Sequence, residues 1–408
     1  MDLLRKSIFV LLAMLLIVPL GAMGCRRNPA PAGTEIRIGI MGGLTGPAGG
    51  TISPVMDELA QIFQYTNEVE GGINGATIDW KIEDNAGTPS GAIAAYGKLR
   101  DTYNPLVYFA VEDYYLLGAK GTINEDESVI FSFSAIQPES FTLPSRMFSI
   151  NIPTSDGFGG FVNWVNDDWQ GTGKPKIGVL YWNDQPSGAQ WQMAQAWALA
   201  QNVDIVPQGY SIVAQDLTAE LLALRTADVD YIWMHGITPN AALAVSTYPS
   251  MGFDENVKFC LMEYVEADLL LTLVGDKAEG FYIYSPSTPA TDGSVAAQHY
   301  TDIWEYHGVE NKQSDFRYFL TLKYVLTAVI EQVVADVGWG NLDSAAIYDA
   351  LLKLTDIDTK GNTGDFGYGP TKRLGVDSII MAKFTKTGTV SISDEMELPN
   401  TFMAAAGQ

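Results

Sequence analysis

Cysteine and basic residues are scarce in this chain of 408 residues. It has two cysteines, Cys25 and Cys260, and 24 lysines and arginines against 48 aspartates and glutamates, a formal net charge of −24. So acidic a chain repels the phosphate backbone of nucleic acids, and no cluster of lysine or arginine offsets the imbalance. An anionic membrane surface repels it for the same reason. The composition therefore excludes nucleic-acid binding and membrane attachment through a basic patch.

Only one long uninterrupted apolar run occurs, and it lies near the N-terminus. Residues 8–20 form this stretch of 13 residues, and Arg5 and Lys6 precede it. As a helix the stretch would rise about 20 Å, too short for a hydrocarbon core of about 30 Å. We expect residues 1–24 to be a cleaved signal peptide, with a short membrane anchor as the alternative.

Cys25 follows directly on the short sequence Ala-Met-Gly at residues 22–24. The segment resembles a bacterial lipoprotein signal, which implies that Cys25 carries lipid and that the protein is anchored at the periplasmic or cell-surface side of a membrane. Residues 25–34 are rich in proline, alanine and glycine and are predicted to be a tether. With Cys25 lipidated, Cys260 has no partner for an intramolecular disulfide, and we expect it to be a small buried apolar side chain.

Strand and helix patterns alternate along the chain from residue 35 onward. Residues 36–40 place isoleucine at every second position, and the Ser53-Pro54 pair indicates the start of a helix. Further strands are predicted at 77–83, 106–111, 130–134, 176–181, 231–234, 378–384 and 389–392, and further helices at 92–102, 190–200, 216–226 and 316–337. Two sets of alternation, 35–152 and 174–280, are separated by connecting sequence rich in glycine, aspartate and tryptophan. This pattern predicts an α/β protein with two parallel sheets.

Signatures of catalysis and of metal binding are missing. The glycine-rich segment 43–50 has neither the Lys-Ser/Thr pair of a phosphate loop nor the G-x-G-x-x-G spacing of a dinucleotide site. No G-x-S-x-G occurs, and the three histidines, His235, His299 and His307, have no metal-binding spacing. We therefore expect a protein that is not an enzyme and that uses neither cofactor nor metal.

Loops rich in aromatic and acidic residues follow several predicted strands. Residues 112–115 (Glu-Asp-Tyr-Tyr) follow one strand, and residues 181–184 (Tyr-Trp-Asn-Asp) follow another. In open α/β sheets, ligands bind outside the carboxyl ends of the strands. These loops are the predicted binding surface, with ordinary solvent-exposed loops as the alternative.

Several segments in order resemble one family, the type I solute-binding proteins of ABC importers that bind branched-chain amino acids. Residues 36–47 are similar to its first strand and ligand loop, and residues 71–75 to the turn after its first helix. Residues 131–139 resemble a later strand and loop, residues 177–188 the start of the second lobe, and residues 259–265 a ligand strand of that lobe. The resemblance covers nearly all of residues 35–390.

The resemblance implies two doubly wound, Rossmann-like lobes joined by a hinge of three chain crossings. Lobe 1 would comprise residues 35–153 and 288–366, and lobe 2 residues 154–287 and 367–408. The crossings would fall near 152–157, 283–289 and 364–372. The long helical segment at 316–337 would then return to pack on lobe 1.

The resemblance also implies which residues face the cleft between the lobes. From lobe 1 and lobe 2 these are Leu44, Thr45, Gly46, Glu112, Asp113, Tyr114, Ser134, Ala135, Ile136, Trp182, Ser187, His235, Glu263 and Tyr284. Glu263 stands where the family's acid pairs with the ammonium group of an amino acid. Glu112 and Asp113, in contrast, stand where the family holds the ligand carboxylate, and like charges repel. A cationic or amide ligand in contact with tyrosine or tryptophan fits this set better than zwitterionic leucine.

The predicted function is that of a monomeric, lipid-anchored binding protein that delivers a small polar solute, such as an amino acid, amide or amine, to the permease and ATPase of an ABC importer. A binding protein that signals to a receptor or regulator uses the same closing cleft, so the sequence leaves that alternative open. A secreted hydrolase would need a nucleophile or a set of metal ligands that the chain does not show.

Overall fold

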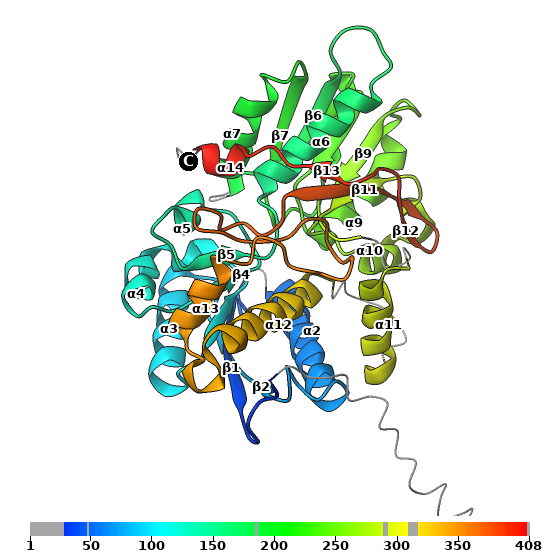
Figure 1. The fold of residues 1–408 in the computed structure, drawn as a ribbon. Coiled ribbons are helices and arrows are strands. Elements are labelled where there is room, and N and C mark those ends of the chain that lie inside the picture. Colours follow the sequence, from blue (N-terminus) through cyan, green and yellow to red (C-terminus); the bar gives the residue numbers. More distant parts are fainter. Residues whose placement is uncertain (1–27, 47–48, 184–186, 289–292, 309–316, 406–408) are drawn as a thin grey trace, which may run out of the picture.

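The computed structural model describes residues 28–46, 49–183, 187–288, 293–308 and 317–405. The predicted signal peptide and Cys25 lie outside these residues. Within them the chain forms two α/β lobes, one above the other in Figure 1. The α/β class with two sets of strands is therefore confirmed. The chain passes between the lobes three times, because the helices between β10 and β11 return to pack on the first sheet.

Lobe 1 is built around a five-stranded, wholly parallel sheet of strand order β2-β1-β3-β4-β5. Its strands are β1 (Glu35–Gly42), β2 (Thr77–Asp84), β3 (Val107–Ala110), β4 (Ile130–Ser132) and β5 (Met147–Ser149). Ile38 in β1 lies beside Trp80 of β2 and Val107 of β3. Every residue of β3, β4 and β5 is buried, as expected of a parallel sheet covered on both faces.

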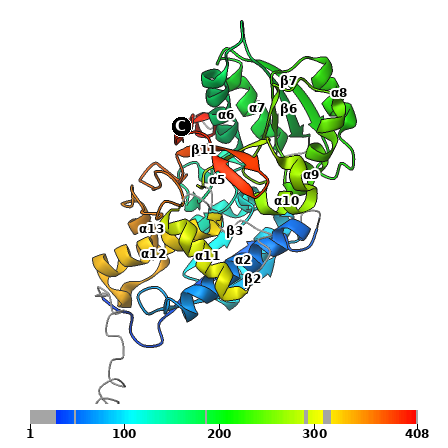
Figure 2. The ribbon, with the colours of Figure 1, turned by 90° about the vertical axis from the view of Figure 1, so that its right-hand side faces the viewer.

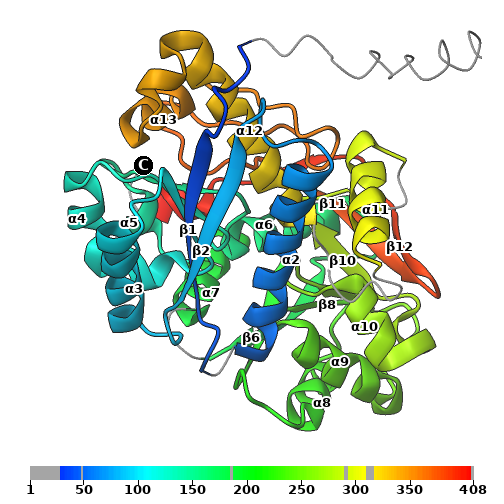
Figure 3. The same cartoon turned by 90° about the horizontal axis from the view of Figure 1, so that it is seen from below.

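Helices cover both faces of the lobe 1 sheet. One face carries α3 (Pro89–Thr102), η1 (Asp113–Ala119), α4 (Lys120–Glu125) and α5 (Pro138–Phe141), and the other carries α2 (Gly49–Glu68), α11 (Val295–His307), α12 (Arg317–Val337), η4 (Trp339–Asn341) and α13 (Ser344–Leu351). Figures 2 and 3 show α11 beside α2, although the two helices are far apart in the sequence.

The start of α2 differs from the prediction. The helix begins at Gly49, so Pro54 lies inside it rather than at its first turn. Pro54 is the sixth residue of the helix, so it lacks the N–H that would bond to the carbonyl of Gly50. The Ser53 hydroxyl donates to the carbonyl of Leu44 at 3.4 Å, so it satisfies a loop carbonyl instead of capping the helix.

Helix α12 is, among the described helices, the one long and apolar enough to span a membrane by length and composition. In this fold it is a core helix instead. Leu320, Val325 and Ile330 are fully buried and pack into the same cluster as β1 and α2.

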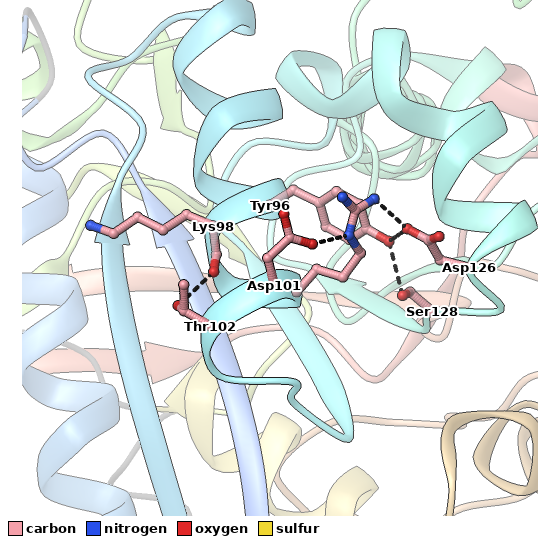
Figure 4. Close-up of polar contacts among 7 residues, drawn as sticks. Tyr96, Lys98, Asp101, Thr102, Asp126 and Ser128 are labelled. Atoms are coloured by element: carbon pink, nitrogen blue, oxygen red, sulfur yellow. Dashed lines mark hydrogen bonds and ion pairs between the residues drawn. The ribbon is translucent and has the colours of Figure 1, made fainter.

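Helix α3 is fixed to its neighbours by the polar contacts drawn in Figure 4. The Tyr96 hydroxyl donates to Asp126 Oδ2 at 2.9 Å and is also hydrogen-bonded to Ser128 Oγ at 2.9 Å. Arg100 forms ion pairs with Asp101 and with Asp126. Because Asp126 and Ser128 lie just before β4, these contacts tie α3 to the amino end of that strand.

Lobe 2 contains a larger, mixed sheet of order β12-β11-β10-β9-β8-β6-β7, with β13 paired to β11. Its strands are β6 (Lys176–Trp182), β7 (Asp204–Tyr210), β8 (Tyr231–Met234), β9 (Lys258–Leu261), β10 (Tyr282–Ser285), β11 (Ser378–Thr385), β12 (Gly388–Ser391) and β13 (Met396–Glu397). Strands β6 to β10 are parallel, and β11 joins β10 in the antiparallel sense. Cys260 in β9 is fully buried, which confirms its predicted environment.

The helices of lobe 2 likewise cover two faces. α6 (Thr154–Asp168) and α7 (Ser187–Ala198) pack on one face, and α8 (Thr218–Thr226), α9 (Thr238–Thr247), η2 (Tyr248–Met251), α10 (Ala267–Val274) and η3 (Gly275–Ala278) pack on the other. Residues 153–173 were predicted to be connecting sequence between the two sets of strands and helices, and this is wrong for most of the segment. Helix α6 occupies it, with Phe158, Phe161 and Val162 fully buried.

The two lobes are joined by more than the three crossings. At the third crossing, Gly375 N donates to Ser149 O at 3.0 Å and Ser149 N donates to Arg373 O at 2.8 Å, so this segment pairs with the end of β5. The C-terminal helix α14 (Thr401–Ala405) then lies at the junction of the lobes, as Figure 1 shows.

Helix α14 forms what we call the C-terminal strap (residues 399–405). The Asp156 carboxylate in α6 accepts hydrogen bonds from Thr401 N at 2.8 Å and Phe402 N at 2.9 Å. The fully buried Phe402 ring enters the core of lobe 1, 6.1 Å from the ring of Phe141. The strap is therefore held by lobe 2 and packed into lobe 1.

Candidate functional site

A cavity of about 170 Å³ lies where loops of the two lobes meet. Lobe 1 contributes α2, the loops after β3 and β4, and the start of α12, while lobe 2 contributes the end of β6 and the loops after β7, β8 and β9. The carboxyl ends of parallel strands are the usual place for a ligand in such sheets. The lining residues are Ile52, Val55, Glu58, Val111, Glu112, Tyr114, Phe133, Ser134, Ile136, Trp182, Ile212, Ile237, Glu263, Tyr264, Glu266, Tyr318 and Phe319.

Most of the lining is apolar, and six of the side chains are aromatic. Phe133 lies at the centre of this group, with ring centroids 5.7 Å from Tyr264, 5.5 Å from Tyr318 and 5.6 Å from Phe319. Because Tyr264 belongs to lobe 2, these ring contacts join the two lobes at the cavity. An apolar cavity of about 150 Å³ in another protein takes up benzene, so this space fits a small organic molecule.

Glu112 places a carboxyl at the cavity directly after β3. It is almost fully buried, and its Oε2 accepts a hydrogen bond from Asn85 Nδ2 at 3.2 Å. Burial raises the pKa of the Glu112 carboxyl to about 7, although the hydrogen bond from Asn85 acts in the opposite direction.

Glu263 is the corresponding acid of lobe 2 and follows β9. It is 2% exposed, and neither carboxyl oxygen has a partner in hydrogen-bond geometry among the described residues. Burial raises its pKa to about 7, against the opposing influence of the Tyr284 hydroxyl behind it. The main-chain carbonyl of Glu263 accepts a hydrogen bond from the Tyr318 hydroxyl at 2.7 Å, which ties this loop to α12.

Glu58 is the third buried acid, and it points from α2. It is 5% exposed, and both of its oxygens lack a hydrogen-bond partner among the described residues. Burial raises its pKa well above the ordinary value, and the nearby carboxyls of Glu266 and Asp57 raise it further. Glu266 also lines the cavity, so four carboxyls from both lobes face this small space.

Asp113, predicted to face the cleft, lies behind the cavity wall instead. Its carboxylate accepts hydrogen bonds from Ile136 N at 2.9 Å, Gln137 N at 3.1 Å and Ser134 Oγ at 2.8 Å. The side chain is fully buried, and burial raises its pKa to about 6 in spite of these donors. Asp113 thus fixes the loop after β4, which carries Ser134 and Ile136 to the cavity.

The loop after β1 does not line the cavity. Thr45 Oγ1 donates to Asp84 Oδ2 at 2.6 Å, and Thr45 N donates to Asp84 Oδ1 at 3.2 Å. Leu44 packs against the lobe 1 core, and Gly46 has a φ of 106° at the turn that follows. The predicted site residues Leu44, Thr45 and Gly46 therefore shape the start of α2 rather than the cavity wall.

The remaining predicted site residues of lobe 2 divide between the wall and the layer behind it. Trp182 lines the cavity, and its Nε1 has no partner among the described residues. His235 lies behind Trp182 with ring centroids 4.6 Å apart, and burial lowers the pKa of His235 to about 3. Tyr284 is also buried behind the wall, next to Glu263. The side chain of Ser187 lies outside the described part of the structure.

Ala135 makes a contact between the lobes rather than with the cavity. Its carbonyl accepts a hydrogen bond from Gln190 Nε2 of α7 at 2.6 Å. Six of the predicted site residues thus line one cavity: Glu112, Tyr114, Ser134, Ile136, Trp182 and Glu263.

Sequence reasoning missed the contributions of two helices. Glu58 falls within the apolar stripe of α2, three residues after Val55 and next to Leu59, and a carboxyl in such a stripe was an available signal. Tyr318 and Phe319 open α12, where the sequence indicated only a core helix. The cavity is therefore lined by helix ends as well as by strand-end loops.

Acceptors outnumber donors at the cavity, and this decides what it can bind. The Ser134 hydroxyl already donates to Asp113, whereas the oxygens of Glu58 and Glu263 have no partner in hydrogen-bond geometry among the described residues. Trp182 Nε1 and the Tyr264 hydroxyl also lack a partner there. In the described part of the chain, no three histidine, cysteine, aspartate or glutamate side chains are grouped so that they could hold a metal ion. The arrangement suits a small organic ligand with hydrogen-bond donors and an apolar part.

Three solved structures show similar folds at low sequence identity. A branched-chain amino-acid ABC transporter protein from Thermus thermophilus with bound valine is 15% identical, with a TM-score of 0.80, and the match covers 92% of this chain and 100% of that one. A fatty acid ABC transporter substrate-binding protein from Thermomonospora curvata is 16% identical, with a TM-score of 0.73 over 92% and 95% of the two chains. A leucine-binding protein from Thermotoga maritima is 14% identical, with a TM-score of 0.70 over 90% and 99%.

Comparison with sequences gives the family. A search of curated proteins finds no match. The family model described as periplasmic binding protein, in contrast, matches residues 35–389, which include both lobes and all lining residues of the cavity. The chain therefore belongs to the periplasmic binding protein family.

Proposed function

We propose that this protein is the extracytoplasmic solute-binding component of an ABC importer, which captures a small polar solute between its lobes and delivers it to a membrane permease and ATPase. The observation that carries the proposal is the cavity, because its wall comes from both lobes and a bound solute would hold them together. The solved structures with this fold include binding proteins of ABC transporters for amino acids and fatty acids, which supports the same role.

Native mass spectrometry of protein purified without denaturation tests the binding step. We expect a retained molecule of small mass, and a solute library of amino acids, amides, amines, carboxylates and sugars should raise the melting temperature with at least one class. Trp182→Ala removes a lining ring and should abolish the shift. Trp169→Ala, which changes a partly buried tryptophan remote from the cavity, is the matched control. No shift with any class would contradict the proposal.

Stimulation of the ATPase tests the delivery step. Solute-loaded protein should increase ATP hydrolysis by its cognate permease and ATPase in proteoliposomes, and Trp182→Ala should not. A protein that binds solute but leaves the ATPase unchanged would instead serve as a sensor.

Lipid attachment through Cys25 belongs to the same proposal. Cys25→Ala should move the protein from the membrane fraction to the soluble fraction without changing its solute-induced melting shift. A variant that stays in the membrane fraction would contradict anchoring through Cys25.

A further inference from the structure

We propose that the solute is an organic cation with an apolar body, whose ammonium group binds among Glu58, Glu112 and Glu263. This inference rests on the proposed function and names the chemical class of its solute. All three carboxyls line the same cavity, and each side chain is at least nine-tenths buried.

The buried acids need a cation, and the described residues of the cavity wall do not supply one. No lysine, arginine or histidine is among the lining residues. The four oxygens of Glu58 and Glu263 have no hydrogen-bond partner among the described residues. A buried carboxylate without a partner is costly, so it either keeps a proton or pairs with a cation that enters from outside.

The donors of the loop after β4, which could otherwise hold a ligand carboxylate, are already in use. Asp113 takes the hydroxyl hydrogen of Ser134 and the main-chain N–H groups of Ile136 and Gln137. A carboxylate placed in the cavity would meet the carboxyls of Glu58, Glu112, Glu263 and Glu266 instead. Anions and zwitterions are therefore disfavoured by like-charge repulsion.

The aromatic wall fits the rest of such a molecule. Phe133, Tyr264 and Tyr318 surround an apolar space, and a ring face also attracts a cation. A bare metal ion would gain little from such a wall. The combination of buried acids and apolar surface thus favours an amine with a hydrocarbon body.

Cation binding should expel protons. Burial raises the pKa of both Glu112 and Glu263 to about 7, so near neutrality the empty site carries protons that an ammonium group displaces. The other titratable groups at the wall are Glu266 and the phenols of Tyr114, Tyr264 and Tyr318, with Asp113, His235 and Tyr284 behind it. His235 has its pKa lowered to about 3 and stays neutral from pH 6 to 8, and the phenols titrate above that range.

Four compounds with nearly the same hydrocarbon body test the charge preference by calorimetry: 3-methylbutylamine (cation), 4-methylpentanamide (neutral), leucine (zwitterion) and 4-methylpentanoate (anion). At pH 8 we expect the amine to bind at least about tenfold more tightly than the other three. Its affinity should fall about tenfold between pH 8 and pH 6 for each carboxyl that becomes protonated. Runs at pH 6.5 in two buffers of different ionisation enthalpy should show that protons are released.

Two glutamine variants test whether Glu58 and Glu263 cause the preference for a cation. Glu58→Gln and Glu263→Gln should each weaken amine binding by tenfold or more, and Glu263→Gln should also reduce the number of protons released. Glu255→Gln, at an exposed position outside the cavity, is the matched control and should leave both unchanged.

The outcomes that overturn the inference differ from those that overturn the proposed function. Equal or tighter binding of leucine or of 4-methylpentanoate would refute the cation, and tightest binding of the amide would show that the carboxyls act as neutral donors. Amine binding unchanged in both glutamine variants would refute the assigned residues. If another class in the solute library binds while none of the amines does, the inference fails but the proposed function stands.

Discussion

Helix α2 carries a buried acid within it, and a partly exposed acid lies just beyond its end; the two have opposite environments. Glu70, beyond the end of the helix, forms ion pairs with His299 Nε2 at 2.9 Å and Lys323 Nζ at 2.9 Å. Burial acts to raise the pKa of Glu70, but His299 and Lys323 outweigh it and lower the value to about 2. Glu58, three turns earlier, has no such partner, and its pKa is raised.

The difference separates acids that stabilise the fold from acids that are available to bind a solute. Glu70 joins α2 to α11 and α12, and these helices supply both of its partners. Glu58 and Glu263 face the cavity, where the described wall offers no cation. An acid that completes the fold is neutralised by the fold, whereas an acid that binds solute is left for the solute to neutralise.

The largest expected effect comes from removing Glu263, one of the acids that face the cavity without a cationic partner. With its pKa raised from an ordinary value near 4.5 to about 7, Glu263 binds more protons in the folded than in the unfolded protein, so its presence lowers stability as pH rises from about 4.5 to 7. Glu263→Gln should therefore gain about 2.5 kcal/mol in unfolding free energy relative to the unchanged protein between pH 5 and pH 8. Urea unfolding at both pH values measures this, and a constant difference would show that Glu263 is not buried as a proton-binding acid.

Removing the lysine that neutralises Glu70 should make the environment of Glu70 more like that of Glu58. Lys323 is 8% exposed, and Lys323→Met leaves Glu70 with a weaker set of partners. We expect a loss of about 2 kcal/mol at pH 7. Because the lowered pKa of Glu70 contributes stability that disappears as pH falls from about 4.5 to 2, the variant and the unchanged protein should converge at pH 2. A loss that is equal at pH 7 and pH 2 would assign it to packing alone.

The converse change gives Glu58 a cationic partner from the chain, as Glu70 already has. Val55 lines the cavity one turn before Glu58 on the same face of α2. Val55→Lys would place an ammonium group beside Glu58 and should weaken the binding of 3-methylbutylamine about tenfold, or about 1.4 kcal/mol. Val55→Met, of similar length but uncharged, is the control. Equal losses in both variants would point to steric blocking.

The smallest effect is expected at an exposed ion pair. Lys353 and Asp336 lie 2.8 Å apart, but the two side chains are 60% and 34% exposed. Solvent screens such a pair, so Lys353→Met should leave the melting temperature unchanged within error. A clear drop in the melting temperature would mean that solvent exposure does not explain why the Lys353–Asp336 pair contributes less to stability than the contacts of Glu70.

The fold was largely predictable from the sequence because buried strands leave a strong pattern. Short apolar runs such as 176–181 and 231–234 end at turn residues and correspond closely to β6 and β8. Helix α6 escaped prediction because it contains Gly157, Gly159 and Gly160, which are poor helix formers. Packing requires them, since a Cβ at Gly157 would approach the Tyr284 ring to 2.7 Å and one at Gly159 would approach Pro399 to 2.3 Å.

The site was predictable only where it follows strands. Glu112 and Glu263 come directly after buried strands, so their place at the sheet edge follows from topology. Adjacent side chains in a loop point in different directions, so the sequence could not show that Glu112 faces the cavity while Asp113 binds the main chain behind it. Glu58 was missed because acids on a helix usually face solvent, and only tertiary packing buries this one.

The C-terminal strap gives the last residues of the chain control over the opening of the lobes. A separation of the lobes at this junction would withdraw Phe402 from the core of lobe 1 or break the hydrogen bonds to Asp156 in lobe 2. Burying a phenylalanine side chain is worth about 1.5–3 kcal/mol, which shifts an equilibrium by about one to two powers of ten. The strap therefore adds to the free energy of separating the lobes at this junction, although none of its residues lines the cavity.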